Sequence, residues 1–199
     1  GPNVENMDYA YHECHNLTGA PVCGDSVINM NNTYHNCWNL TGPLACGDNV
    51  TYMTSAYYNC YNLTGQPASG VALYMNYTYW NCTNLTGSPV CGPDVRNMAY
   101  AYYNCYKLTG NAVFSNTTND ISYAYYNCHN LTTAVCGNNV TSMVRTYYNC
   151  KNLTTAVCGP NVTDMSYTYN YCNNLTGNPV CGDNVINMYS TYATCKNIT

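Results

Sequence analysis

The chain has 199 residues, of which 46% are apolar and only 7% are charged, and its formal net charge is −4. The charged fraction lies far below the roughly 25% of ordinary soluble domains, so Asn, Thr, Ser and Tyr must cover most of the surface. Five scattered Lys and Arg residues cannot form a basic patch for phosphates, and no apolar run approaches the ~20 residues of a membrane-spanning helix. We therefore expect no nucleic-acid partner and no membrane-spanning segment.

One cysteine column divides the sequence into tandem repeats of 22 or 23 residues. Its members are Cys14, Cys37, Cys60, Cys82, Cys105, Cys128, Cys150, Cys172 and Cys195. Such a period predicts a solenoid, in which each repeat is one coil that buries its apolar side by stacking on its neighbours. We expect residues 1–199 to form a single repeat domain of the α/β solenoid class, with about nine leucine-rich-repeat-like coils. Each coil should hold a short parallel strand and a short helix or 3₁₀ turn.

The first predicted element of each coil ends at this cysteine. Met, or once Ile, stands seven residues before the Cys, Ala or Thr stands four before it and Tyr three before it, as in Met98, Ala101, Tyr102 and Cys105. Apolar residues at i, i+3, i+4 and i+7 share one face of a helix, and Asn97 is a typical N-cap. The pattern predicts about two turns of helix over 7–14, 30–37, 53–60, 75–82, 98–105, 121–128, 143–150, 165–172 and 188–195.

A short extended segment should follow each helix. The sequence continues as Asn-Leu-Thr, usually Gly, one or two small residues and Val-Cys-Gly, as in residues 84–92. Gly and Pro interrupt this stretch too often for a helix, so it predicts a short strand and a turn. We expect the Leu of each repeat and the Val after it to point inward, and a later Val to begin the return to the Met.

The repeat Val-x-x-Met-x-x-Ala-Tyr-x-x-Cys-x-Asn-Leu-Thr resembles the unit of the BspA-like class of leucine-rich repeats, Val-x-x-Ile-x-x-x-Ala-Phe-x-x-Cys-x-x-Leu. Met replaces Ile, Tyr replaces Phe, and the Met-to-Tyr spacing is one residue shorter; the resemblance covers the whole chain. It implies a non-catalytic scaffold on the surface of bacteria or some protists, which binds proteins or other cells in adhesion. An extracellular or cell-surface location is therefore expected.

A second cysteine column lies eight or nine residues after the first. It comprises Cys23, Cys46, Cys91, Cys136, Cys158 and Cys181. Fifteen cysteines in a short chain are compatible with a disulfide framework. However, Ser69 and Phe114 replace the second cysteine in two repeats that keep the first. We therefore favour reduced thiols that pack as small core residues over bridges between the two columns.

No recurring constellation predicts a metal site, a cofactor or catalysis. Potential metal ligands crowd only at His12, Glu13, Cys14, His15 and His35, and the chain has no Cys-x-x-Cys pair. No nucleophile stands beside a base at a repeated position, and the nine Asp and Glu residues are scattered. We expect no enzyme, no cofactor and no bound metal.

The Asn-Leu-Thr segments also match the acceptor pattern for N-glycosylation. Their asparagines are Asn16, Asn39, Asn62, Asn84, Asn130, Asn152, Asn174 and Asn197. Glycans on every coil, about 4.8 Å apart, would collide. We interpret these residues as an amide ladder that bonds to the backbone or to the next coil, which favours a bacterial or phage source.

Two outward columns of aromatic residues form the candidate binding surface. One stands two residues before the Cys, and the other five before it. The predicted binding residues are Tyr58, Trp80, Tyr103, Tyr126 and Tyr148 of the first column and Tyr100 and Tyr123 of the second. Tyr with Asn and Ser resembles the chemistry of antibody paratopes, so we expect a protein or glycan ligand. The alternative is that these rings only cover the coils.

Two other functions remain open from the sequence. Neither end shows a distinct capping sequence, so we interpret the chain as a fragment of a longer array or as a filament subunit that stacks end to end. The Thr column that includes Thr18, Thr41 and Thr64 raises ice binding as a third possibility.

Overall fold

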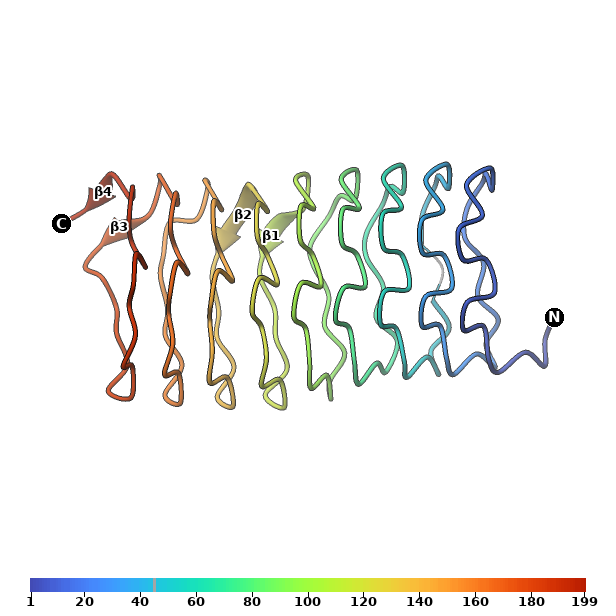
Figure 1. The fold of residues 1–199 in the computed structure, drawn as a ribbon, viewed down its shortest axis with the longest axis horizontal. Helices are drawn as coiled ribbons and strands as arrows, with labels where there is room; N and C mark the ends of the chain where they lie inside the picture. The colour runs from blue at the N-terminus through green and yellow to red at the C-terminus, as the bar shows by residue number, and fades with distance from the viewer. Residues whose placement is uncertain (45) are drawn as a thin grey trace.

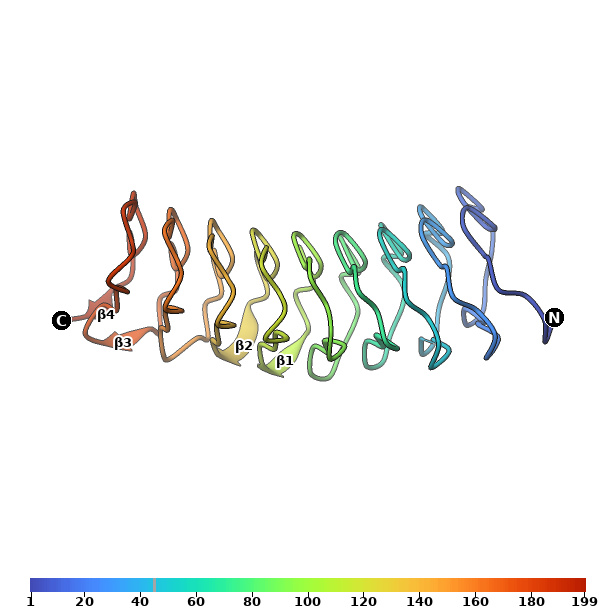
Figure 2. The same ribbon diagram turned by 90° about the horizontal axis from the view of Figure 1, so that it is seen from below.

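The structure, a computed structural model, describes residues 1–44 and 46–199. The chain forms a row of similar coils that stand side by side along one axis, with its two ends at opposite ends of the row (Figure 1). After a quarter turn the coils are seen to be flattened loops (Figure 2). This arrangement confirms the solenoid predicted from the repeat.

Short parallel strands form at the Asn-Leu-Thr segments. They are β1 (Thr109–Asn111), β2 (Asn130–Thr133), β3 (Thr176–Gly177) and β4 (Asn197–Ile198). β1 pairs with β2 and β3 with β4, each in parallel with the next coil. Isolated parallel bridges such as Gly42 to Leu63 continue the same ladder elsewhere. The predicted extended segment therefore exists, although it is shorter than an ordinary strand in most coils.

A second parallel ladder lies directly before the Met column. It joins Asn6, Asn29, Tyr52, Tyr74, Asn97, Asp120, Ser142, Asp164 and Asn187 in succession. Two parallel ladders thus join consecutive coils, and they help to keep the side-chain columns in register.

The helix expected between the Met and Cys columns does not form anywhere in the described part of the chain. Alternate backbone N–H groups explain this difference. The N–H of Ala101 donates to the carbonyl of Met98 three residues earlier (3.0 Å), whereas the N–H of Tyr100 donates to the carbonyl of Ser122 in the next coil (2.9 Å), and the alternation continues to Cys105. An α-helix needs consecutive N–H groups to bond four residues back. The segment is therefore a run of overlapping turns.

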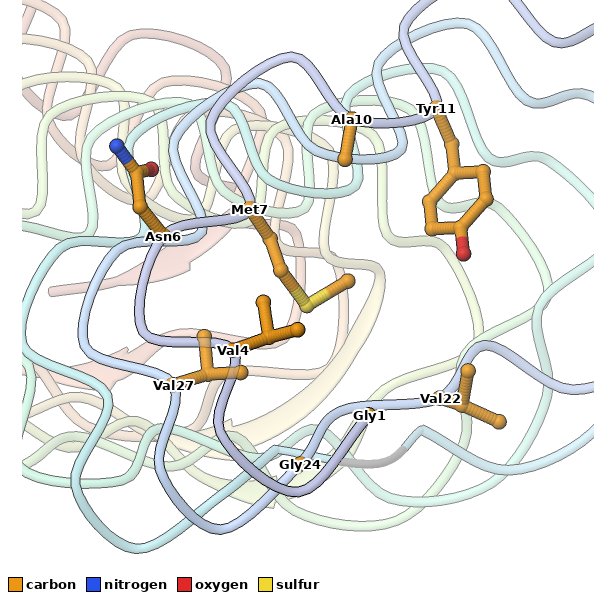
Figure 3. A pocket seen from close by; sticks show the side chains of 9 residues that line it. All are labelled: Gly1, Val4, Asn6, Met7, Ala10, Tyr11, Val22, Gly24 and Val27. Carbon is orange, nitrogen blue, oxygen red and sulfur yellow. The ribbon is translucent and has the colours of Figure 1, made fainter.

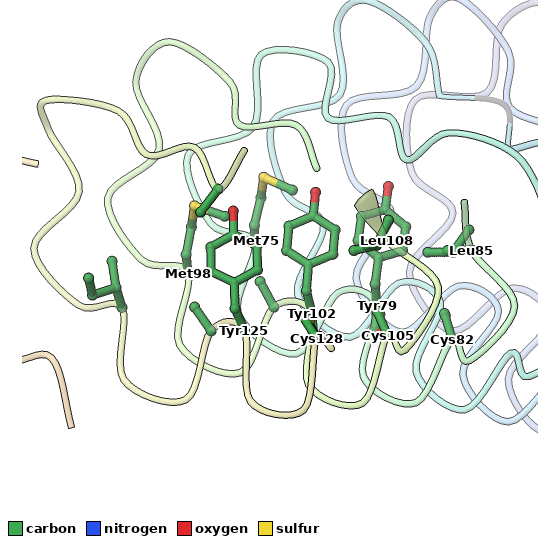
Figure 4. Close-up of a cluster of buried hydrophobic side chains, with 14 of the residues drawn as sticks. Met75, Tyr79, Cys82, Leu85, Met98, Tyr102, Cys105, Leu108, Tyr125 and Cys128 are labelled. Carbon is green, nitrogen blue, oxygen red and sulfur yellow. Dashed lines mark hydrogen bonds between the residues drawn. The ribbon is translucent and has the colours of Figure 1, made fainter. Parts of the chain in front are cut away.

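The side-chain pattern predicted for the helix is nevertheless correct. Met98, Ala101, Tyr102 and Cys105 are all fully buried, and so is Leu108 from the following segment. Equivalent side chains of neighbouring coils lie one behind another in the core (Figure 4). The turns therefore direct residues at i, i+3, i+4 and i+7 to one side, as a helix would.

The buried tyrosines also close each coil across its width. The Tyr125 hydroxyl donates to the carbonyl of Val113 (3.0 Å) and accepts the N–H of the same residue (3.2 Å). The equivalent pairs are Tyr34 with Val22, Tyr79 with Ala68, Tyr102 with Val90, Tyr147 with Val135, Tyr169 with Val157 and Tyr192 with Val180. These valines are held at the edge of the core, where they are partly buried or, at Val22, exposed. This corrects the expectation that they point fully inward.

Candidate functional site

Apart from the exposed Cys14, the first cysteine column belongs to the core or packs against it. Each thiol from Cys37 to Cys195 donates to the carbonyl of the buried Tyr in the preceding coil, at 2.9–3.1 Å. All fifteen cysteines of the chain are described, and each is free. Burial raises the pKa of Cys60, Cys105 and Cys150 well above the ordinary thiol value. These thiols are therefore protonated packing groups, in agreement with the sequence interpretation.

The Asn-Leu-Thr amides bond to the preceding coil. The side-chain N–H of Asn62 donates to the Trp38 carbonyl (2.8 Å), and that of Asn152 donates to the side-chain oxygen of Asn130 (3.3 Å). Both kinds of contact were expected from the sequence. The predicted amide ladder is thus present along this column.

A second, more continuous amide ladder was not predicted. It consists of the asparagines directly before the cysteines, in which each member after the first donates to the previous one at 2.7–2.8 Å: Asn36, Asn59, Asn81, Asn104, Asn127 and Asn149. All six have φ between 57° and 62°. Asn is the non-glycine residue that adopts this left-handed region most readily. Its recurrence in six consecutive coils was the signal available in the sequence.

The residues two before each cysteine form a stack of rings, here called the first lane. Its members are His12, His35, Tyr58, Trp80, Tyr103, Tyr126 and Tyr148. Successive ring centroids lie 3.9–5.6 Å apart, and the ring planes differ by 15° or less. Each ring is partly exposed. The five predicted binding residues of this column are thus brought together in one continuous row.

The residues five before each cysteine form a second lane beside the first. Tyr77, Tyr100 and Tyr123 stack at 4.9 and 4.5 Å. Arg145 continues the lane: its guanidinium carbon lies 5.5 Å from the Tyr123 ring centroid and 4.5 Å from that of Tyr167, and Nη1 donates to the Tyr123 hydroxyl (2.7 Å). Arg145 was not among the residues predicted from the sequence, because no other coil has a cation at this position.

The two lanes touch each other and form one surface, here called the aromatic stripe. Trp80 lies 5.2 Å from Tyr100, Tyr100 lies 6.1 Å from Tyr103, and Tyr123 lies 6.0 Å from Tyr126, measured between ring centroids. The seven predicted binding residues are therefore neighbours in space. Tyr77 and Tyr167 belong to the same outward column five residues before the Cys, and Arg145 extends the surface beyond the prediction.

The second lane holds its tyrosines in a strained backbone conformation. Tyr77, Tyr100, Tyr123 and Tyr167 have φ between 57° and 59°. A left-handed conformation costs a bulky L-residue about 1–2 kcal/mol. The equivalent residues Asn32 and Ser55 of earlier coils adopt it with smaller side chains. The same conformation recurs at this position in every coil, from Tyr9 to Ser190, so it belongs to the repeat, and the tyrosines of the stripe adopt it at a local cost.

The stripe offers ring edges and hydroxyl groups to a partner. Each ring from His35 to Tyr126 in the first lane has a stacked neighbour on both faces. Burial raises the pKa of Tyr100 to about 12 and also raises that of Tyr103 and Tyr126. These phenols are therefore neutral hydrogen-bonding groups at physiological pH, and Arg145 is the one charged member of the two lanes as the structure describes them.

The remaining sequence candidates form no comparable site. His12 and His35 stack in the first lane at 4.8 Å, His15 packs edge-on against Trp38 at 4.0 Å, and burial lowers the pKa of His35. Across residues 1–44 and 46–199, no three His, Cys, Asp or Glu side chains gather as a metal-binding group. The same residues contain no helix of the length and apolarity needed to cross a membrane.

Comparison with known proteins identifies the repeat. The profile of the BspA type leucine-rich repeat region matches residues 75–199, in six copies. The matched residues include most of the aromatic stripe. No curated protein and no solved structure matches the chain.

Proposed function

The chain belongs to the BspA-type leucine-rich repeat family, and from that premise we propose that it is a non-catalytic recognition or adhesion scaffold. We place it outside the cell or on a bacterial or phage surface, and assign partner binding to the aromatic stripe. The observation that carries this proposal is the stripe itself, a continuous row of partly exposed rings with one cation. Large rigid side chains with few rotatable bonds lose little entropy on binding.

The geometry of the stripe favours a protein partner over a glycan. A sugar ring that stacks on an aromatic side chain needs an open ring face, and the inner rings of the first lane have both faces covered by neighbours. Ring edges and phenol hydroxyls remain, and these can meet backbone amides and apolar side chains. The aromatic stripe also has few charged residues, as is typical of the core of a protein–protein interface.

Adhesion to cultured epithelial cells tests this proposal. Beads coated with the chain should adhere to the cell layer, and the variant Tyr103→Ser/Tyr126→Ser/Tyr148→Ser should reduce adhesion at least tenfold. Trypsin treatment of the cells should abolish binding, whereas periodate oxidation of their sugars should leave it intact. Loss of binding with periodate alone would instead assign a glycan partner.

A matched control uses three exposed threonines of the same three coils. The variant Thr109→Ala/Thr132→Ala/Thr154→Ala removes side chains beside the strand ladder and leaves every ring in place. It should adhere as the parent chain does. If the tyrosine variant melts cooperatively and adheres as well as the control, the stripe is not the binding surface.

End-to-end association of this chain is the second candidate, because its end faces expose core columns. At the N-terminal face, Val4, Met7, Ala10 and Tyr11 border a cavity of about 270 Å³ (Figure 3). At the opposite face, Met188 is 37% exposed. Sedimentation velocity over a concentration series should then show growing rods, and Ala10→Asp should return the chain to single particles. Single particles at every concentration would eliminate this candidate.

A further inference from the structure

The second cysteine column has a chemical environment unlike that of the first. Its six thiols are partly or fully exposed, and each contacts the carbonyl of the residue after it at only 3.3–3.6 Å. The buried thiols of the first column are engaged at 2.9–3.1 Å by carbonyls of the preceding coil. Reagents from solvent can therefore reach the thiols of the second column, whereas the buried thiols of the first column are inaccessible to them.

Two coils have another residue in place of the second-column cysteine, and these replacements divide the six thiols into three groups. Ser69 separates Cys46 from Cys91, and Phe114 separates Cys91 from Cys136. Cys23 and Cys46 are thus an adjacent pair, whereas Cys136, Cys158 and Cys181 are three consecutive members. Cys91 alone has no cysteine in either neighbouring coil.

Four of these sulfurs lie against the next coil, namely those of Cys23, Cys46, Cys136 and Cys158. The N–H of Gly47 donates to Cys23 Sγ (3.3 Å). A Cβ atom on Gly159 would lie 2.7 Å from Cys136 Sγ. Gly47, Gly159 and Gly182, which each follow a cysteine of this column, therefore leave space for the sulfur of the coil before them.

This position is within bridging range of the next cysteine. Stacked tyrosine rings of consecutive coils lie 5.1–5.8 Å apart in the core, and this coil spacing is inside the ~4.4–6.8 Å range of Cα separations across a disulfide. Members two coils apart are separated by about twice the coil spacing, which is beyond that range.

We propose that the second column is a set of inter-coil disulfide sites: Cys23 bridges to Cys46, and Cys158 bridges to either Cys136 or Cys181. The oxidant is a low-molecular-weight disulfide such as oxidised glutathione. One thiolate attacks a glutathione sulfur and expels one glutathione thiolate, which leaves a mixed disulfide. The neighbouring thiolate then attacks the protein sulfur of that mixed disulfide and expels the second glutathione, so two thiols become one bridge while one oxidised glutathione becomes two reduced ones.

Two features set the rate and the limit of this reaction. Burial raises the pKa of Cys136 to about 11, and a backbone N–H from Gly159 in the next coil partly opposes the effect. Because the thiolate is the attacking species, bridging is slow at neutral pH and faster in mild alkali. Cys158 takes part in both possible bridges of its group, so that group forms one bridge and retains one thiol.

The inference is tested by incubating the folded chain with oxidised glutathione. The reaction is then quenched with acid, the remaining thiols are alkylated, and the peptides are mapped by mass spectrometry without reductant. The expected products are the Cys23–Cys46 bridge and one bridge that includes Cys158, with a glutathione adduct on Cys91. The seven buried thiols of the first column, Cys37 to Cys172, should remain alkylatable only after denaturation. Absence of both bridges, or a bridge between the two columns, would overturn the proposal.

Serine variants sharpen this test, and Ser69 already occupies the same column position in one coil. Cys158→Ser should abolish bridging within the group of three, because Cys136 and Cys181 are then two coils apart. Cys136→Ser should leave a Cys158–Cys181 bridge at full yield. A Cys136–Cys181 bridge in the Cys158→Ser chain would contradict the inference, and thermal melting before oxidation checks that each variant is folded. The reaction needs no binding partner, so its outcome is independent of the proposed recognition function.

Discussion

At the scale of the residue, the buried tyrosine of each coil packs its ring in the core and bonds its hydroxyl to the backbone. Consecutive members stack with centroids 5.1–5.8 Å apart and planes within 16° of each other. From Tyr34 onward, each hydroxyl whose bond is described both donates to and accepts from one backbone residue across the coil, as in Tyr102 with Val90. The related repeat unit has Phe here, which would leave that backbone N–H and carbonyl without a partner.

Removal of one such hydroxyl should therefore lower the stability of the folded chain. Tyr125→Phe keeps the ring and its stacking but leaves the N–H and carbonyl of Val113 unpaired. The free energy of unfolding in urea should fall by about 1–3 kcal/mol, the usual cost of an unsatisfied buried polar group. Tyr106→Phe, at an exposed ring, should change it by less than about 0.5 kcal/mol. Equal effects of the two substitutions would contradict the role assigned to the buried hydroxyls.

The buried phenols and thiols also predict loss of stability in alkali. Burial raises the pKa of Tyr34 to about 12 and that of Cys37 to about 11, above unfolded values of about 10 and 8.5. The folded state therefore binds more protons, so its stability is complete below about pH 8.5 and falls as pH rises toward 12. Tyrosinate absorbance followed with circular dichroism should show buried tyrosines ionising only as the fold is lost. Ionisation of all 24 tyrosines near pH 10 with the fold intact would contradict this account.

At the scale of the element, the sequence predicts which side chains face inward but not the backbone conformation that places them there. A helix and a run of overlapping turns both bring i, i+3, i+4 and i+7 to one side. The turns form instead of a helix because N–H groups such as that of Tyr100 bond to the next coil. Those bonds join residues 22 or 23 positions apart, so local periodicity cannot show them.

The same distinction applies to the candidate site. Its two aromatic columns follow from the repeat, and the seven residues chosen from the sequence lie together in the aromatic stripe. Their mutual stacking, which covers the ring faces, depends on coil spacing and appears only in three dimensions. The contact of Arg145 with Tyr123 and Tyr167 likewise joins different coils.

Substitution of Asn104 distinguishes turns from a helix. Asn104 has φ 62° and bonds to Asn81 and Asn127 through its amide. Ala and Gly both remove that amide, but only Gly adopts the left-handed conformation without strain. Asn104→Gly should therefore be more stable to urea than Asn104→Ala by about 1 kcal/mol. In a helix Ala would instead be favoured by about 1 kcal/mol, so that order would contradict the turn structure.

At the scale of the whole molecule, stability comes from contacts between consecutive coils. Two parallel ladders, two amide ladders and the stacked tyrosines all run along the solenoid axis. Arrays of this kind behave as a sum of repeat and nearest-neighbour terms. A coil can therefore be removed without loss of the fold, provided that every column stays in register.

Thermal unfolding of a one-coil deletion tests this account most directly. Deletion of residues 83–105 joins Cys82 to Tyr106, which shortens every column by one coil and keeps the columns aligned. Deletion of residues 94–105 instead leaves half a coil and shifts the columns out of alignment. The full-coil deletion should melt cooperatively at a somewhat lower Tm than the parent chain, and the half-coil deletion should show no cooperative transition. Cooperative melting of both at the same Tm, or loss of the transition in both, would contradict a solenoid held together by columns in register.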